Sequence, residues 1–333
     1  MTTLAIVGCA HIHIGGFVHT LNSRPDIRCK TVWDHDPARA EKRAAELGAS
    51  VAPSYEAIYA DPEIEAVLVC TETNLHEQVV LPGAAAKKHL FIEKPLGFGA
   101  ADAYRMAKAI EGAGVIYGTG FFMRGYPTLL FLKEQVDRGA FGKITRVRGS
   151  NCHSGALGRW FDTEWRWMAD PKIAGVGAFG DLGAHALDIL LWLFGDVTEV
   201  TAQLDSGTGA YEGCDETGEA LMRFASGTLG TLAAAWDDVA DPVTFLVSGT
   251  EGHAAIINGD LYFKSSHMDG ADGKTPWTQL PTALPASLDA FVDAITGKAA
   301  AQVSVREAAY RSAVMEAMYS GAHQSAWKEP VRS

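Results

Sequence analysis

The sequence has few cysteines, no excess of positive charge and no long uninterrupted apolar run. Its five cysteines are odd in number and show no C-x-x-C spacing, so they predict neither a disulfide framework nor a thiolate zinc site. The formal net charge of −12 argues against the basic surfaces that nucleic acids and anionic membranes require. These absences predict a cytoplasmic protein with no nucleic-acid partner and no membrane partner.

The most apolar stretch, residues 186–195, is too short to span a bilayer and carries Asp188. No basic segment precedes an apolar segment at the start of the sequence, so we expect no signal peptide. Internal repeats and long low-complexity tracts are also missing. A length of 333 residues with 47% hydrophobic content predicts about two globular domains.

Apolar segments alternate with helical patterns through the first 120 residues. Strands are expected at residues 4–7, 28–33, 66–70, 90–92 and 115–117, with helices of ten or so residues between them. This alternation predicts an α/β fold with a doubly wound parallel sheet.

The second part of the sequence has a different pattern. Short, partly alternating segments at residues 199–204, 219–224, 228–236, 243–248, 253–257 and 260–263 favour an antiparallel sheet. Helices are expected at residues 128–138, 181–195, 281–297 and 304–324, and a mobile loop at 265–275. We place the domain boundary near Gly120, which gives domains of residues 1–120 and 121–333.

The turn after the first strand is a candidate dinucleotide site. The three glycine positions of a G-x-G-x-x-G motif are occupied by Gly8, Ala10 and His13, so only the first one matches. Asp34 follows the second strand, where a carboxylate accepts a bond from a ribose 2′-hydroxyl and repels a 2′-phosphate. We therefore predict NAD rather than NADP, the alternative being an ordinary acidic surface turn.

Histidines in the same turn raise the question of a metal site. His11 and His13 lie two residues apart, and His76 could join them. Alternate residues in a loop seldom face one ion, and no other ligand spacing supports a site. We predict that no metal is bound and that His11 lies near the nicotinamide or the substrate.

Two charged residues, Glu93 and Lys94, end the strand at 90–92 just before Pro95. Ligands of open α/β sheets bind at the carboxyl ends of strands, although a solvated ion pair would give the same pattern. Asp181 and His185 lie one helical turn apart, so both could reach one small molecule. A histidine suits proton exchange with a hydroxyl, and the alternative is a structural His185–Asp181 hydrogen bond.

Several aromatic and basic residues come from segments expected to border the cleft. They are Phe122, Arg124, His153, Trp165 and Arg166. Aromatic faces and hydrogen-bond donors suit a polyhydroxylated ring. For Trp160, Trp165 and Trp167, packing of an irregular loop onto the sheet is an equally good explanation.

In combination these pieces resemble the Gfo/Idh/MocA family of nicotinamide-dependent oxidoreductases. The resemblance rests on the turn at residues 6–16, Asp34, residues 71–76, the Glu93-Lys94-Pro95 triplet and the block at 165–195, which contains a D-x-G-x-H pattern. It implies an N-terminal Rossmann domain and a C-terminal α/β domain with a large, mostly antiparallel sheet. The open face of that sheet implies a homodimer or homotetramer. One departure is Glu72, which stands where the family usually has proline.

The resemblance implies an NAD-dependent dehydrogenase acting on a secondary alcohol of a sugar, sugar derivative or cyclic polyol. His185 would be the general base, Lys94 would bond the same oxygen, and Asp181 would orient His185 or hold a neighbouring hydroxyl. The expected cofactor-binding residues are Gly8, Ala10, His11, Ile12, Asp34, Thr71, Glu72, Asn74, His76, Glu93 and Lys94. The expected substrate-binding residues are Lys94, Arg124, His153, Trp165, Arg166, Asp181 and His185.

Two other functions remain open at this point. Enzymes of the same fold use NAD transiently during elimination or glycoside cleavage on sugars. A non-catalytic, dinucleotide-sensing regulator is also compatible with the fold, although the presence of Lys94, Asp181 and His185 counts against a dead site.

Overall fold

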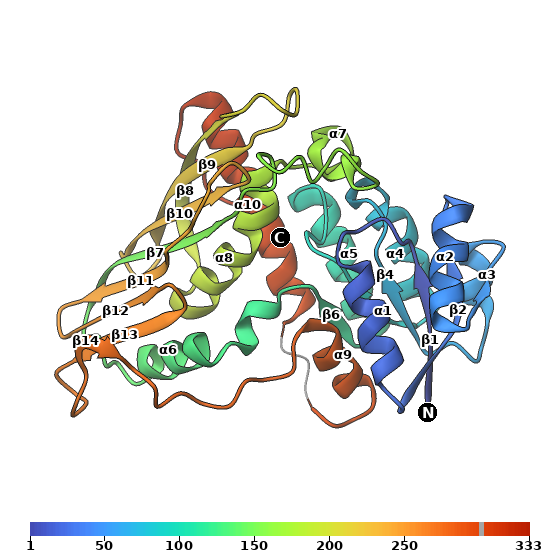
Figure 1. The fold of residues 1–333 in the computed structure, drawn as a ribbon, viewed down its shortest axis with the longest axis horizontal. Helices are drawn as coiled ribbons and strands as arrows, with labels where there is room; N and C mark the ends of the chain where they lie inside the picture. Colours follow the sequence, from blue (N-terminus) through green and yellow to red (C-terminus); the bar gives the residue numbers. More distant parts are fainter. Residues whose placement is uncertain (300–302) are drawn as a thin grey trace.

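The computed structural model describes residues 1–299 and 303–333, which form two β-sheets with helices packed on them (Figure 1). The first sheet has the strand order β3-β2-β1-β4-β5-β6, and all its strand pairs are parallel. Its strands are β1 (Thr2–Val7), β2 (Ile27–Trp33), β3 (Ser50–Val51), β4 (Ala66–Val69), β5 (His89–Ile92) and β6 (Tyr117–Thr119). The doubly wound parallel sheet predicted from the sequence is confirmed.

Helices connect these strands and cover both faces of the sheet, as a parallel sheet requires. They are α1 (Ile14–Ser23), α2 (Pro37–Leu47), α3 (Tyr55–Ala60), η1 (Thr73–Leu75), α4 (His76–Ala85) and α5 (Ala100–Ala113). The strand order reverses between β1 and β4, and ligands of such sheets bind at this switch point.

The second sheet has eight strands in the order β14-β13-β12-β11-β7-β10-β9-β8. Only β7 and β10 are paired in parallel, so the sheet is mostly antiparallel, as predicted. Its strands are β7 (Ile144–Cys152), β8 (Val197–Asp205), β9 (Thr217–Phe224), β10 (Leu229–Ala235), β11 (Val243–Gly249), β12 (Gly252–Ile257), β13 (Asp260–Ser265) and β14 (Asp272–Pro276). The mobile loop expected at 265–275 is wrong in part, because Asp272–Pro276 pairs with β13.

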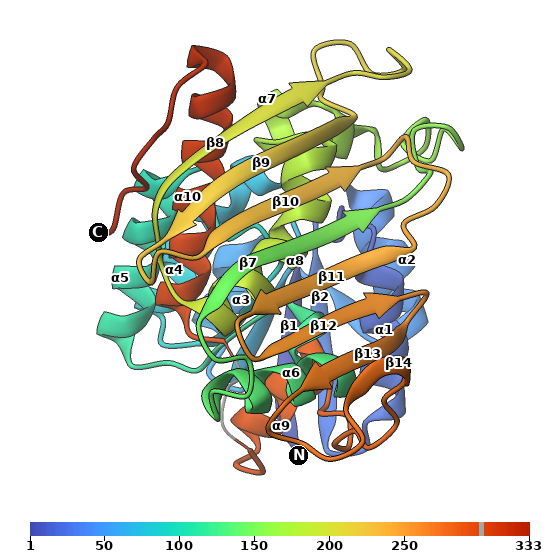
Figure 2. The same cartoon turned by 90° about the vertical axis from the view of Figure 1, so that its left-hand side faces the viewer.

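One face of this second sheet packs on helices, and the other face is open. The inner face contacts α8 (Ala178–Phe194), and the remaining helices of this half are η2 (Phe122–Gly125), α6 (Pro127–Asp137), η3 (Arg166–Ala169) and α7 (Pro171–Ala174). In Figure 2 the outer face points toward the viewer, and no helix of the described residues lies in front of it.

The two C-terminal helices reach back to the first half of the chain. Helix α9 (Ser287–Ile295) packs against β5 and β6, where the ring of Phe291 lies 5.8 Å from that of Phe91. Helix α10 (Val305–Gln324) lies between α5 and the second sheet (Figure 1). The two sheets therefore share packed helices, and a division of the chain at Gly120 stays a prediction.

The stretch Pro171–Phe194, which contains α7 and α8, is long and apolar enough to cross a membrane. However, 83% of its most apolar window is buried inside the protein. Burial of this kind is found in core helices, and α8 fills that role between the second sheet and α10.

Candidate functional site

Lys94 joins the two halves of the molecule. It follows β5 at the carboxyl end of the first sheet, and its ammonium Nζ lies 2.6 Å from Oδ1 of Asp181, in the first turn of α8. The Lys94 side chain is 2% exposed. Burial makes a charge-assisted hydrogen bond of this kind a strong constraint on position. The pair therefore places the end of the parallel sheet directly against the helix that carries His185.

Asp181 is ionised and bonded on both oxygens. Burial acts to raise the pKa of this carboxyl, but the opposing charge and hydrogen bond of Lys94 lower it to about 2. Its second oxygen, Oδ2, accepts a bond of 3.2 Å from the indole Nε1 of Trp236. Among the described residues neither bond of the carboxylate goes to His185. Asp181 therefore orients Lys94, and the expected His185–Asp181 hydrogen bond does not form.

His185 is a buried, neutral imidazole. Burial lowers its pKa well below the ordinary value of 6.5, and the positive charge of Lys94 lowers it further. The ring centroid lies 4.7 Å from that of Phe122, and Nδ1 has no hydrogen-bond partner within the described part of the chain. An unpartnered nitrogen on a neutral ring is an available proton acceptor near pH 7.

Glu93, on the other side of Lys94, organises the turn after β1. Its Oε2 accepts the backbone N–H of Lys94 at 2.8 Å, and its Oε1 lies 3.0 Å from Nδ1 of His13. Because an ionised carboxylate only accepts, Nδ1 of His13 donates this hydrogen bond. Burial acts to raise the pKa of Glu93, but its hydrogen bond with His13 and the positive charge of Lys94 oppose this effect, and that pKa is lowered.

His11, His13 and Glu93 form the one cluster in the described residues that could hold a metal ion, with their ligand atoms within 4.8 Å of one another. The two histidines of the turn do face each other, with ring centroids 4.6 Å apart, which differs from our expectation. Burial lowers the pKa of His11 to about 3 against the opposing effect of Glu93, so this ring is neutral. Hydrogen bonds account for the contacts of this cluster, and the absence of a metal stays a prediction.

A cavity of about 310 Å³ opens beside Lys94, Asp181 and His185. Its lining comes from both halves of the chain: Ile12, His13, Lys94, Phe122, Asn151, His153, Trp160, Phe161, Met168, Asp181, Leu182 and His185. One wall is aromatic, since the ring of Trp160 lies 4.8 Å from that of His153. A cavity with a few polar groups among aromatic rings suits one small polyhydroxylated molecule.

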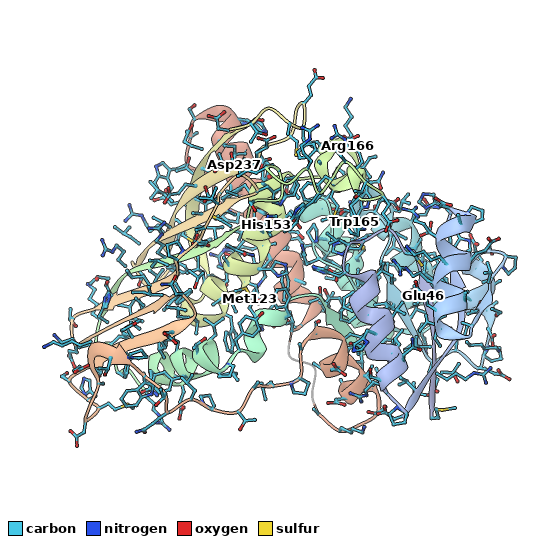
Figure 3. All side chains as sticks on the ribbon, viewed as in Figure 1. Glu46, Met123, His153, Trp165, Arg166 and Asp237 are labelled. Atoms are coloured by element: carbon cyan, nitrogen blue, oxygen red, sulfur yellow. The ribbon has the colours of Figure 1, made fainter. Side chains whose placement is uncertain are left out.

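Three of the expected substrate contacts lie elsewhere. Arg124 is buried and makes a two-point ion pair with Asp188 of α8, through Nε at 2.9 Å and Nη2 at 2.6 Å. Arg166 is half exposed and places its guanidinium 4.8 Å from the ring centroid of Tyr211. Trp165 packs on the core of the second half without lining the cavity, and in Figure 3 it lies below Arg166 and level with His153.

Several cavity residues were not expected from the sequence, among them Trp160 and Asn151. Trp160 was considered only as a packing residue, and Asn151 was not singled out at all. Asn151 lies at the end of β7, where its amide Nδ2 donates to the carbonyl of Leu182 at 3.0 Å. Only the pairing of β7 with distant strands brings it to α8, so no local pattern in the sequence could have identified it.

The other end of the switch point holds Asp34. This carboxylate accepts the backbone N–H of Cys9 at 2.5 Å and that of Asp36 at 2.7 Å, and Arg39 lies 2.9 Å from its Oδ1. Burial acts to lower the pKa of Arg39, but Asp34 and Glu72 raise it. Glu72 and Asn74 line an adjoining cavity of about 450 Å³.

The turn between these two regions depends on Gly8. Its φ of +86° is unfavourable for other residues, and a Cβ there would lie 2.4 Å from the backbone nitrogen of Thr71. The next expected contact, Ala10, donates its N–H to Cys70 and accepts a bond of 3.1 Å from the indole of Trp167. His76 is buried, and its Nδ1 bonds the carbonyl of Leu96, so it positions the segment after Lys94.

Several buried polar atoms along this region have no hydrogen-bond partner among the described residues. They include Oγ1 of Thr71, Oε2 of Glu72 and Nδ1 of His185. Buried polar atoms are nearly always paired, so the unpartnered atoms of Thr71 and Glu72, which follow β4 beside the switch point, fit residues that meet a bound polar ligand.

Comparison with known families agrees with this architecture. The model of an oxidoreductase family with an NAD-binding Rossmann fold, Gfo/Idh/MocA, matches residues 2–121. The model of the Gfo/Idh/MocA C-terminal domain matches residues 129–255.

Two of the relatives are dehydrogenases of a sugar derivative and of a cyclic polyol. Levoglucosan dehydrogenase of Pseudarthrobacter phenanthrenivorans is 27% identical over 280 residues, which are 75% of this chain and 71% of the relative. Myo-inositol 2-dehydrogenase of Thermotoga maritima is 35% identical over 182 residues, 52% of this chain and 50% of the relative. A structure of levoglucosan dehydrogenase in complex with NADH and L-sorbose has a TM-score of 0.85 at 20% identity, covering 100% of this chain and 99% of the other, and it supports the fold.

Proposed function

Because this chain belongs to the Gfo/Idh/MocA family of oxidoreductases, we propose that it is an NAD-dependent dehydrogenase acting on a secondary alcohol of a sugar, sugar derivative or cyclic polyol. One observation carries the proposal. The 2.6 Å bond from Lys94 to Asp181 places an ammonium group and the neutral His185 at one cavity, next to the switch point of a dinucleotide fold.

The cofactor-binding residues of the proposal line the switch point from Asp34 to Lys94. When bound there, NAD supplies the hydride acceptor for the alcohol carbon. The turn at Gly8, the carboxylate of Asp34 and the unpartnered atoms of Thr71 and Glu72 are the groups that would hold it.

Residues of the chain itself remove the proton from the substrate hydroxyl. His185 takes the proton of the substrate hydroxyl, since its lowered pKa keeps the ring neutral. Lys94 donates a hydrogen bond to the same oxygen and stabilises the negative charge that develops on it. Asp181 holds Lys94 in place through the buried ion pair. Phe122 and Trp160 exclude water and present apolar faces to the C–H bonds of a ring.

A panel of sugars, sugar acids and cyclic polyols incubated with NAD tests this proposal through the absorbance of NADH. We expect turnover with at least one member of the panel and a clear preference for NAD over NADP. If NADH binds to the protein in a calorimeter but no member of the panel is oxidised, the dehydrogenase proposal fails.

A second activity is favoured by His13. The Glu93-oriented ring of His13 lines the same cavity as His185, so the site has two proton-exchanging groups where a simple dehydrogenation needs one. A transient oxidation followed by elimination or glycoside cleavage would use both. Product formed without net NADH identifies that activity and excludes simple dehydrogenation.

We also propose that the chain is a cytoplasmic homodimer or homotetramer. Its five cysteines are all free, as is usual in a reducing compartment. The open face of the second sheet carries Leu221 and Leu229, each about half exposed. Such apolar residues on an uncovered sheet support an interface between copies of the chain.

A further inference from the structure

Arg39 is held between two carboxylates that belong to different strand ends. Its Nη2 lies 2.9 Å from Oδ1 of Asp34, after β2, and 3.0 Å from Oε1 of Glu72, after β4. His35 completes the group, with Nε2 3.1 Å from the same Nη2 and 3.6 Å from Oε1 of Glu72. One guanidinium nitrogen therefore connects both acidic residues beside the cavity of about 450 Å³.

Asp34 is already heavily engaged by its own surroundings. Its Oδ2 accepts the Cys9 N–H, and its Oδ1 accepts both the Asp36 N–H and Arg39. Each carboxylate oxygen has about two lone-pair sites, so Asp34 can accept roughly one further bond, through Oδ2. A ribose with two neighbouring hydroxyls needs a second acceptor.

Glu72 has an oxygen available for that bond. Its Oε2 is buried without a hydrogen-bond partner within the described ranges, while the residue is 8% exposed and lines the cavity. Its other oxygen is occupied by Arg39. Glu72 can thus accept a hydroxyl on one side and restrain Arg39 on the other.

We propose that Glu72 is a second determinant of cofactor choice, beside Asp34. It accepts a hydroxyl of the adenosine ribose, and it keeps the guanidinium of Arg39 from receiving a 2′-phosphate. This inference rests on the proposed use of NAD.

The local charge balance supports the proposal. The positive Arg39 faces Asp34 and Glu72 directly, and the carboxylate of Asp36 lies 3.9 Å from its Nε. A 2′-phosphate would add further negative charge to a group that already has more acidic than basic residues. Repulsion between these carboxylates and a 2′-phosphate would favour NAD over NADP. Of these acidic residues, Glu72 can be neutralised without disturbing the loop hydrogen bonds that Asp34 accepts.

Calorimetric dissociation constants for NADH and NADPH test the inference without a substrate. In the unaltered protein we expect NADPH to bind at least ~100-fold more weakly than NADH, and in Glu72→Gln we expect this ratio to fall by ~10-fold, with NADH itself binding several-fold more weakly. The matched control is Glu77→Gln, because Glu77 pairs with the exposed Arg105 and lies outside both cavities. It should leave both constants unchanged.

Two further variants guard against misfolding and indirect effects. Glu72 has φ of −58°, which proline can adopt, so Glu72→Pro should fold and show the same fall in the ratio. Adding Arg39→Ala to Glu72→Gln should abolish the gain in NADPH binding, since Arg39 is the group that receives the phosphate.

The inference is overturned if the ratio is unchanged in the folded Glu72 variants, or if the gain persists without Arg39. Unaltered protein that binds NADH and NADPH equally well would also overturn it. If the ratio shifts as expected but no alcohol is oxidised, only the proposed dehydrogenase function fails.

Discussion

The surroundings of His185 determine at which pH the proposed base can work. Burial, followed by the charge of Lys94, lowers its pKa well below 6.5, so the ring is unprotonated through the neutral range. For alcohol oxidation we therefore expect kcat/KM to stay constant from neutral pH down to pH 6.5 and to fall only in more acidic solution. Phe122→Ala should admit water next to the ring and move this acidic limb toward pH 6.5. An acidic limb centred at or above pH 6.5 in the unaltered enzyme would contradict the assignment.

At the scale of single residues, the sequence predicted the site residues whose position follows from their spacing along one helix or strand. Asp181 and His185 lie one turn apart on a helix, and Lys94 ends a buried strand, so their meeting could be anticipated. The ion pair of Arg124 with Asp188 could not be predicted, because the two residues lie on different elements. Sequence spacing also left open whether Asp181 would bond Lys94 or His185, and the structure shows the bond to Lys94.

At the scale of elements, we expect glycine-to-alanine substitutions in the turn after β1 and in α1 to differ in their effect on stability. In Gly8→Ala the new methyl would strain a φ of +86° and meet Thr71, so we expect a loss of ~2 kcal/mol or more in the free energy of unfolding. Gly16→Ala lies within α1, with no atom within 4 Å of the new Cβ, and should be neutral or stabilise by up to ~1 kcal/mol. Urea unfolding monitored by tryptophan fluorescence measures both. Equal effects of the two substitutions would contradict this account of the turn.

Helices α8 and α10 and the η2 turn are joined by a buried ion network. Asp188 is 1% exposed and accepts bonds from Arg124 and from Nε of Arg311 at 2.9 Å. Asp188→Ala would leave two buried guanidinium groups without this partner, and we expect it to cost ~3–5 kcal/mol in the free energy of unfolding. Asp137→Ala removes an exposed partner of Lys133 and should cost less than ~1 kcal/mol. Chemical denaturation compares them, and a small effect of Asp188→Ala would show that the network is not required.

Long periodic elements could be predicted and very short ones could not. Most strands and helices of the parallel sheet follow their apolar runs, although β6 lies at Tyr117–Thr119 and not at the expected 115–117. β3 has only two residues, both exposed, and α3 has six. Such segments are held by neighbouring strands and not by a periodic pattern of their own. The pairing of β14 with β13 is missed for the same reason, since Asp272–Pro276 reads as a polar loop.

At the scale of the whole molecule, the open face of the second sheet predicts where copies of the chain associate. Replacing Leu221 and Leu229 with lysine would place charges on this face, and we expect the particle mass in light scattering to fall toward that of one chain. Val239→Lys is the matched control, because Val239 is highly exposed in the loop between β10 and β11. If the mass does not change in the double variant, the interface lies elsewhere.

The site itself belongs to the whole molecule, because neither sheet contains it alone. Lys94 and Glu93 come from the end of the parallel sheet, while Asp181 and His185 come from the helix on the second sheet. The family resemblance predicted both sheets, and the comparisons confirm the family and the fold. The roles of the individual residues stay predictions until variants are measured.

The most direct test is the kcat of Lys94→Ala and His185→Ala with NAD and the best alcohol of the panel. We predict that each variant loses at least ~100-fold in kcat, as expected for acid–base groups, while the dissociation constant of His185→Ala for NADH changes little. The exposed Lys108→Ala and His19→Ala serve as controls and should retain full activity. Near-normal kcat in both site variants would contradict the account.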